Sequence, residues 1–235
     1  MVYETIRNEC CQANIELVNR GLVDMTFGNA SVFDPNERVF AIKPSGVSYS
    51  EMQPKDMVVV GLDGTVLDGD LRPSSDTPTH RCLYLAFEKL GVRSIVHTHS
   101  RNTVAFAQAA LPIPCLGTTH SDFFDGPVPV TRVMTSDEVN GEYEWETGNV
   151  IVEAFEKLDP MRMPAVLVNG HGSFAWGKSG SKAVEHGFAL EVVADMALKT
   201  LSLNPKANPV SDYLLSKHFD RKHGDTAYYG QKNNA

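Results

Sequence analysis

Apolar residues near the start of the chain recur at the spacing of one helical face. Ile6, Cys10, Ala13 and Leu17 follow one another at intervals of three or four residues, which places them on one side of an α-helix. Gly21 comes shortly after, and glycine often ends a helix because it adopts the left-handed conformation freely. The pattern predicts an amphipathic helix that ends near Gly21.

Short apolar runs of β type come next. Residues 27–33, 39–42 and 57–62 are apolar at many positions, with valine, isoleucine and phenylalanine prominent among them. Such runs predict strands. The Asp63-Gly64 pair that follows the third run is typical of a tight hairpin turn. Together these segments indicate an antiparallel region early in the chain.

The pattern then alternates between helix and strand. Thr77 is expected to cap a helix that has Pro78 in its first turn and stops at Gly91. Residues 94–100 begin with an apolar run typical of a buried strand. Further on, the periodicity predicts a helix over 136–158, strands around a turn over 165–176, and helices over 181–203 and 212–223.

Length and composition are those of a globular protein. Of the 235 residues, 42% are hydrophobic and 21% are charged, which is enough apolar material for a sizeable core. No repeat or composition break divides the chain. We therefore expect a single layered α/β domain over residues 1–235, with a frayed polar tail over about 231–235.

The charge balance excludes several kinds of partner. A formal net charge of −8 argues against a general nucleic-acid surface or an anionic-membrane surface, because both are negatively charged. A phosphorylated ligand would need a local cluster of donors. Neither a secretory leader nor a membrane span is visible, and the four cysteines lack paired metal-ligand spacing. We expect reduced thiols and a cytoplasmic protein.

Histidines provide the clearest chemical signal. His97 and His99 are one residue apart on the predicted strand, and side chains alternate across a strand, so both imidazoles face the same side. His171 is a third candidate. Three imidazoles leave an open position on a catalytic zinc ion. Asp76 is a possible fourth ligand, a carboxylate that orients one, or simply a helix cap. Nitrogen and oxygen ligands would also accept manganese or iron.

Two loops carry small, donor-rich residues that suit a phosphate group. One loop covers residues 43–46 and the other residues 72–76, directly before the predicted helix. Backbone amides, hydroxyls and an ammonium group are the donors that a phosphate needs, although each loop alone also reads as an ordinary turn. Neither nucleotide-binding glycine motif is present. A small phosphorylated substrate is the better prediction.

These segments, taken in order, resemble the class II aldolase and epimerase family, nearly from end to end. The matching segments are Phe27–Asn29, Ile42–Val47, Pro73–His80, Ile95–Ser100, Gly117–Asp122, Gly141–Gly148, His171–Gly172, Phe174–Gly177, Lys217–His218, Arg221–Gly224 and Tyr228–Gln231. The resemblance implies a central, largely antiparallel β-sheet flanked by helices. It also implies a homotetramer with active sites between subunits.

The resemblance further implies which residues form the site. The zinc-binding positions fall on Asp76, His97, His99 and His171. The phosphate-binding positions fall on Asn29, Lys43, Ser45, Gly46, Ser74 and Ser75. The acid/base pair falls on Asp122 and Tyr229, with Tyr229 reaching the metal of a neighbouring subunit.

The implied activity is the interconversion of L-ribulose 5-phosphate and D-xylulose 5-phosphate, by cleavage and re-formation of the C3–C4 bond. The alternative within the family is an aldolase acting on another sugar phosphate, such as L-fuculose 1-phosphate. An alternative of another class is a non-catalytic protein with a structural zinc ion, although such sites usually include cysteines.

Charged residues outside these sets have two possible roles. His218, Arg221 and His223 lie on the predicted last helix at spacings that place them near one face, where they either support the site or are solvated. Glu142, Glu144 and Glu146 are expected to form a charged helix surface, and the alternative is that one of them contacts a neighbouring subunit.

Overall fold

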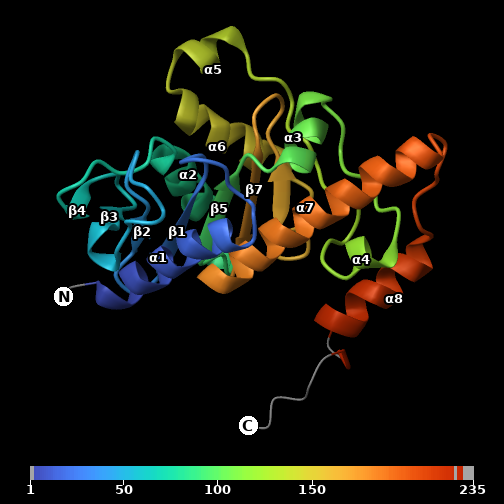
Figure 1. Ribbon diagram of the computed structural model, residues 1–235, viewed down its shortest axis with the longest axis horizontal. Coiled ribbons are helices and arrows are strands. Elements are labelled where there is room, and N and C mark those ends of the chain that lie inside the picture. The colour runs from blue at the N-terminus through green and yellow to red at the C-terminus, as the bar shows by residue number, and fades with distance from the viewer. Residues whose placement is uncertain (1–2, 225–226, 230–235) are drawn as a thin grey trace.

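A β-sheet with helices packed against it forms the body of the protein (Figure 1). In the residues that the computed structural model describes, 3–224 and 227–229, seven strands form one sheet in the order β4-β3-β2-β1-β5-β7-β6, and each neighbouring pair is antiparallel. The strands are β1 (Asn29–Asp34), β2 (Val39–Ile42), β3 (Val58–Gly61), β4 (Val66–Asp68), β5 (Ser94–Thr98), β6 (Ala165–Leu167) and β7 (Ser173–Gly177). The predicted α/β architecture with a largely antiparallel sheet is confirmed.

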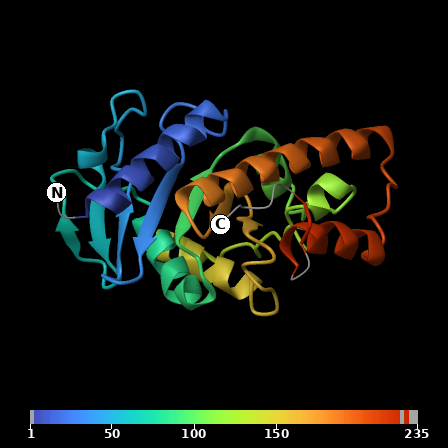
Figure 2. The ribbon, with the colours of Figure 1, turned by 90° about the horizontal axis from the view of Figure 1, so that it is seen from below.

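Helices cover both faces of the sheet. They are α1 (Glu4–Asn19), α2 (Thr77–Phe87), α3 (Arg101–Gln108), α4 (Thr118–Ser121), α5 (Ser136–Asn140), α6 (Tyr143–Ala154), α7 (Gly180–Leu203) and α8 (Asp212–His223), with short 3₁₀ turns at Pro54–Asp56 and Glu88–Leu90. Figure 2 shows α1 and α7 on one side of the strands and α2 and α6 on the other. At one end of the molecule, α4 and α8 pack against each other beside α7.

Burial on both faces explains why the central strands read as continuous apolar runs. All four residues of β2 and of β3 are buried, and so are all five of β5. Cys10 and Cys11 of α1 pack with β1–β3 in a smaller core, beside the main core around Trp176 and Phe174. The four cysteines are free and buried, as expected for core thiols. No helix of the described residues is long and apolar enough to traverse a bilayer.

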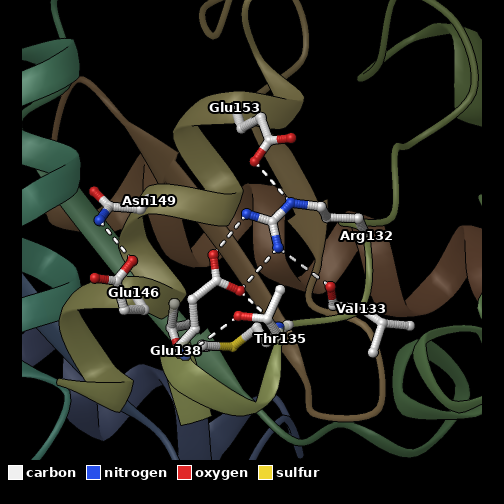
Figure 3. A network of polar contacts seen from close by, with 9 residues as sticks. Arg132, Val133, Thr135, Glu138, Glu146, Asn149 and Glu153 are labelled. Atoms are coloured by element: carbon white, nitrogen blue, oxygen red, sulfur yellow. Dashed lines mark hydrogen bonds and ion pairs between the residues drawn. The ribbon is translucent and has the colours of Figure 1, made fainter. Parts of the chain in front are cut away.

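The predicted helix over 136–158 is wrong as one element. Gly141 takes a non-helical conformation between α5 and α6, with φ −91° and ψ −129°. Figure 3 shows the polar network that secures the break: Arg132 binds Glu138 of α5 at 2.7 Å and Glu153 of α6 at 2.9 Å, and Thr135 and Glu138 form a capping box. The residue pattern over 136–158 does not distinguish one helix from two, because the side chain that stabilises the break, Arg132, lies before this segment.

Three smaller expectations also need correction. The N-cap of α2 is Asp76, not Thr77, which is already helical. His99 lies one residue beyond the end of β5. The edge strand β4 was not predicted, because its three residues are too few to show a strand pattern and two of them are exposed. The tail expected over 231–235 lies outside the described residues, and the single-domain organisation over 1–235 stays a prediction.

Close packing of α2 on α6 depends on a glycine. A Cβ added at Gly148 would lie 2.5 Å from Cys82 Cβ and 2.8 Å from its Sγ. We expect Gly148→Ala to destabilise the fold by about 1–3 kcal/mol, because overpacking outweighs the helix propensity that alanine adds.

Urea unfolding of both Gly148→Ala and Gly117→Ala checks this expectation. Gly117 is extended and has nothing within 4 Å of its added Cβ, so that variant serves as the matched control. A Gly148→Ala midpoint equal to that of the control would contradict the packing argument.

Candidate metal and phosphate site

Three imidazoles meet at the end of the β5–β7 pair. β5 supplies His97, the chain just beyond it supplies His99, and the turn before β7 supplies His171. One ring nitrogen from each lies within 4.8 Å of the other two, and the Nε2 atoms of His97 and His99 are 3.0 Å apart. Three converging nitrogens match what a divalent metal needs from a protein. The donor set in the described chain therefore fits such an ion.

Hydrogen bonding sets the tautomer of His97. Its Nδ1–H donates to the Ser173 carbonyl oxygen at 2.9 Å, and a carbonyl can only accept. The lone pair of Nε2 is thus left to face His99. The ring is 1% exposed and stacks on Phe174, with centroids 4.3 Å apart and an interplanar angle of 19°. Such support is typical of metal-ligating histidines.

Burial also favours the neutral imidazole that binds metal. Burial first, and then the nearby His97 and His99, lower the pKa of His171 to about 4. The pKa of His99 is lowered as well, by burial first and then by His97. Near neutral pH, both rings are therefore available as ligands rather than as cations.

Asp76 lies in the same cavity, but its side chain is not a helix cap. It occupies the N-cap position of α2 without making a side-chain capping bond, and its Oδ2 accepts a hydrogen bond from Asn29 at 2.5 Å. Burial raises the pKa of this carboxyl, but His97, His80 and the Asn29 bond outweigh that effect and bring the pKa below its usual value. Asp76 is outside the close group of three imidazoles. Its role as a fourth ligand stays a prediction.

The two donor-rich loops are joined side by side. Pro44 and Pro73 form a β-bridge, Ser45 N–H donates to the Arg72 carbonyl at 2.9 Å, and Ser74 N–H donates to the Lys43 carbonyl at 3.0 Å. Together with the histidines, these loops line one cavity of about 410 Å³. The predicted phosphate-binding residues in its wall are Asn29, Lys43, Ser45, Gly46, Ser74 and Ser75. The structure thus brings both predicted sets together.

Lys43 gives this cavity a buried positive charge. The residue is 2% exposed, and burial lowers its pKa. Its ammonium group donates to the Pro44 carbonyl at 3.3 Å and lies 4.8 Å from the centroid of the Tyr49 ring. Across the described residues, no carboxylate forms an ion pair with it. A buried, unpaired cation favours an anionic ligand.

Asn29 connects the two halves of the cavity. Its amide group donates to Asp76 and, at 3.1 Å, to Ser74 Oγ. Its Oδ1 is buried and has no hydrogen-bond partner among the residues that the structure describes. An unsatisfied buried acceptor is costly, so a hydroxyl group of a ligand would be a suitable donor for it.

Two residues of this region escaped the sequence analysis. Tyr143, in the first turn of α6, lines the cavity, and its hydroxyl oxygen lies 3.5 Å from His171 Nδ1. Glu144 lines the cavity too, rather than a solvated helix surface as expected. In the sequence, these two residues were marked only by the family-like segment Gly141–Gly148. The helix predicted over 136–158 had no break at Gly141, and the break is what places both side chains at the cavity.

His80 forms a buried network behind the cavity. Its Nδ1 lies 2.7 Å from Ser31 Oγ, which is itself 2.7 Å from the hydroxyl oxygen of Tyr84. Burial lowers the pKa of His80 to about 3, so the ring is neutral. Its position one helical turn after Asp76 was visible in the sequence, but its burial depends on the packing of α2 on the sheet.

The predicted acid/base pair lies elsewhere. Asp122, at the end of α4, accepts hydrogen bonds from Arg221 at 2.9 Å and from His218 at 3.1 Å, and its carbonyl oxygen accepts one from His223 at 2.8 Å. Three residues of α8 therefore converge on Asp122, and their support of an active site stays a prediction. The Arg221 guanidinium lies 4.9 Å from the Tyr229 ring centroid. Neither Asp122 nor Tyr229 lines the histidine cavity of its own chain.

Comparison with known proteins agrees with this geometry. A model of the class II aldolase and adducin N-terminal domain matches residues 8–198. The chain belongs to this family. Two class II aldolase relatives are the proteins named L-ribulose-5-phosphate 4-epimerase UlaF of Salmonella paratyphi C (strain RKS4594) and of Salmonella typhi. Each is 48% identical over 229 residues, which are 97% of this chain and 100% of the relative.

Solved structures show that the class II aldolase fold is shared. An L-fuculose 1-phosphate aldolase superimposes with a TM-score of 0.78 at 23% identity, over 92% of this chain and 95% of that one. The L-fuculose-1-phosphate aldolase from Thermus thermophilus has a TM-score of 0.68 at 25% identity, over 88% of this chain and 100% of its own.

The contacts of Asp122 predict how it titrates. Partial burial raises the pKa of its carboxyl, but hydrogen bonds from Arg221 and His218 outweigh burial and hold the pKa below its usual range. The bonds therefore stabilise the α4–α8 contact above the unfolded carboxyl pKa of about 3.9 and are lost as the pH falls through the folded value. We expect Arg221→Gln to raise the pKa of Asp122.

Carbon-13 NMR of labelled aspartate carboxyl groups measures this shift. Arg20→Gln is the matched control, since Arg20 pairs with Glu16 on α1. The interpretation is wrong if Asp122 titrates at the same pH in the wild type and in Arg221→Gln.

Proposed function

We propose that this protein is a metal-dependent epimerase that interconverts L-ribulose 5-phosphate and D-xylulose 5-phosphate. The observation that carries the proposal is the single cavity that combines three convergent imidazoles with the buried Lys43 ammonium. A sugar phosphate offers both a phosphate dianion and neighbouring oxygen atoms for a metal. The relatives named as epimerases, which match this chain over nearly its whole length, support this substrate.

The substrate explains why two subsites are needed. C4 of the pentulose is two bonds from the ketone and has no acidic proton, so its configuration is inverted by breaking and re-forming the C3–C4 bond. A bound divalent cation supplies Lewis-acid stabilisation of the negative charge that develops on the sugar oxygens. The loops around Lys43 and Ser74 hold the phosphate end, so that the aldehyde fragment turns without leaving.

Proton transfer falls to Asp122 and Tyr229 in this proposal. The histidine cavity is not lined by either residue of the same chain, and the Tyr229 side chain is 59% exposed. We therefore assign them to the cavity of a neighbouring copy in a homotetramer. His218 and Arg221 keep the Asp122 carboxylate ionised and oriented, which suits a group that accepts a proton.

The donor set favours zinc among divalent metals. Three nitrogen ligands with an open position are typical of catalytic zinc, while a mixed nitrogen and oxygen set also suits manganese. Four free cysteines are consistent with a cytoplasmic protein, since thiols remain reduced there.

A direct assay tests the reaction. Purified protein incubated with L-ribulose 5-phosphate is expected to yield D-xylulose 5-phosphate without net release of fragments, as measured by carbon-13 NMR of the mixture. Cleavage of L-fuculose 1-phosphate with release of two fragments, and no epimerisation, would favour the aldolase instead.

His97→Asn tests the metal site. The substitution removes one of three converging nitrogens, so we expect loss of bound metal and of turnover. Metal analysis after dialysis measures this. His120→Gln is the matched control, because His120 is buried away from the cavity and the glutamine amide nitrogen reaches the place of the Nε2 that donates to the Gly126 carbonyl. Full metal content in His97→Asn would refute the ligand role.

Mixing two inactive variants tests the shared site. We expect Tyr229→Phe to retain metal but to lose about 10²–10⁴-fold in rate, as for an acid/base group. Tetramers reassembled from equal amounts of His97→Asn and Tyr229→Phe chains should regain about a quarter of the wild-type sites, if each site combines two chains. Absence of any recovery after verified exchange of subunits would mean that each site is built from one chain.

A further inference from the structure

A second cavity, of about 600 Å³, is lined in part by α8, the helix that lies at one end of the molecule (Figure 1). It is enclosed by the segments that follow α4 and precede β6, by the first two turns of α7, and by α8. Among the described residues, the two cavities of one chain have no lining residue in common. A ligand in the second cavity therefore occupies a different place from the substrate proposed for the histidine cavity of the same chain.

The charge of this cavity is opposite to that of the chain. Four basic side chains line it, Arg162, Lys178, Lys182 and Lys222, together with two histidines. Among the described residues, no aspartate or glutamate lines it. The chain as a whole has 29 acidic residues against 21 basic ones. Such a local excess of positive charge attracts anions.

Only half of these cations have a counter-ion. Arg162 pairs with Asp125 at 2.7 Å, and Lys182 pairs with Glu185 at 2.5 Å. Lys178 and Lys222 form no ion pair with a carboxylate in the part of the chain that the structure describes. Two unpaired positive charges match the two negative charges of a phosphate monoester near neutral pH.

Aromatic rings form the other walls. The Lys222 ammonium lies 3.5 Å from the centroid of Phe123 and 5.9 Å from that of Tyr229, and the Arg162 guanidinium lies 4.5 Å from that of Phe219. Burial lowers the pKa of Lys222, in keeping with a position against these rings. The walls thus offer apolar faces to an organic group next to the cations.

We infer that this cavity is a second ligand site, which binds a small organic phosphate monoester with an apolar or aromatic body. Lys178 and Lys222 hold the phosphate, and Phe123, Phe219 and Tyr229 contact the body. The ligand would also touch the surroundings of Asp122, because His223 lines the cavity and donates to the Asp122 carbonyl. That coupling, unlike the binding itself, rests on the proposed function.

Binding of phenyl phosphate to the intact protein tests the inference. Calorimetric titration is expected to reveal two sites per chain, one in each cavity. Lys43→Met should remove the site near the histidines. Lys178→Gln should weaken the other site about tenfold, since it removes a charge-assisted hydrogen bond, and Lys178→Gln combined with Lys222→Gln should abolish it.

Lys206→Gln is the matched control, because Lys206 is exposed and lies after α7, outside both cavities. Lys178 is exposed as well, so its single substitution should leave folding unchanged. One site per chain that is lost in Lys43→Met and unchanged in both lysine variants would overturn the inference. The inference would also be overturned if side chains of a neighbouring subunit filled the second cavity, so that phenyl phosphate could not enter it. Because the readout is binding, failure of the epimerase assay would not affect this result.

Turnover gives a separate test of the coupling. In an active enzyme, phenyl phosphate in the second cavity should change the maximal rate with L-ribulose 5-phosphate, and Lys178→Gln should weaken that effect. Purely competitive inhibition, unchanged by Lys178→Gln, would exclude the coupling.

Discussion

Antiparallel pairing of β5 with β7 is the constraint on which the metal site depends. The register sets Thr98 opposite Ser173, so the turn that carries His171 must lie beside the residues that follow β5. The same pairing brings the Ser173 carbonyl to His97 and fixes the tautomer of that ring. A slip of one residue would turn His97 to the opposite face of the sheet. The strand pairing that forms this part of the sheet therefore also positions the histidines.

Local chemistry made much of this visible in the sequence. Alternation along a strand is enough to pair His97 with His99, and helical periodicity is enough to find α8 with its observed bounds. The two donor-rich loops were recognisable by their residue types, although only tertiary structure shows that residues 43–46 and 72–76 are hydrogen-bonded to each other. Patterns within a segment predict that segment, while contacts between segments are decided by packing.

Features set by distant residues were not predictable in this way. The break between α5 and α6 depends on Arg132, which lies before both helices and binds each of them. Tyr143 reaches His171 only because of that break. Similarly, β4 is defined by its pairing with β3 rather than by its own apolar content. Exposed edge strands and interrupted helices are cases in which the neighbours, not the segment, determine the structure.

The two ends of the molecule carry different kinds of ionisable group. One end presents three convergent imidazoles with the buried Lys43 ammonium, and the other presents a carboxylate that three residues of one helix surround. Of the described residues, neither Asp122 nor the three α8 side chains bonded to it line the histidine cavity of the same chain.

Burial of Lys43 has a consequence for the lifetime of the protein. A cation removed from water without a counter-ion raises the free energy of the empty form, and any phosphate ester that enters the cavity offsets this cost. By mass action, such a ligand shifts the folding equilibrium toward the native state. Cells in which sugar phosphates run low would then hold the enzyme in its most fragile form, so that its abundance could follow the supply of its own substrate.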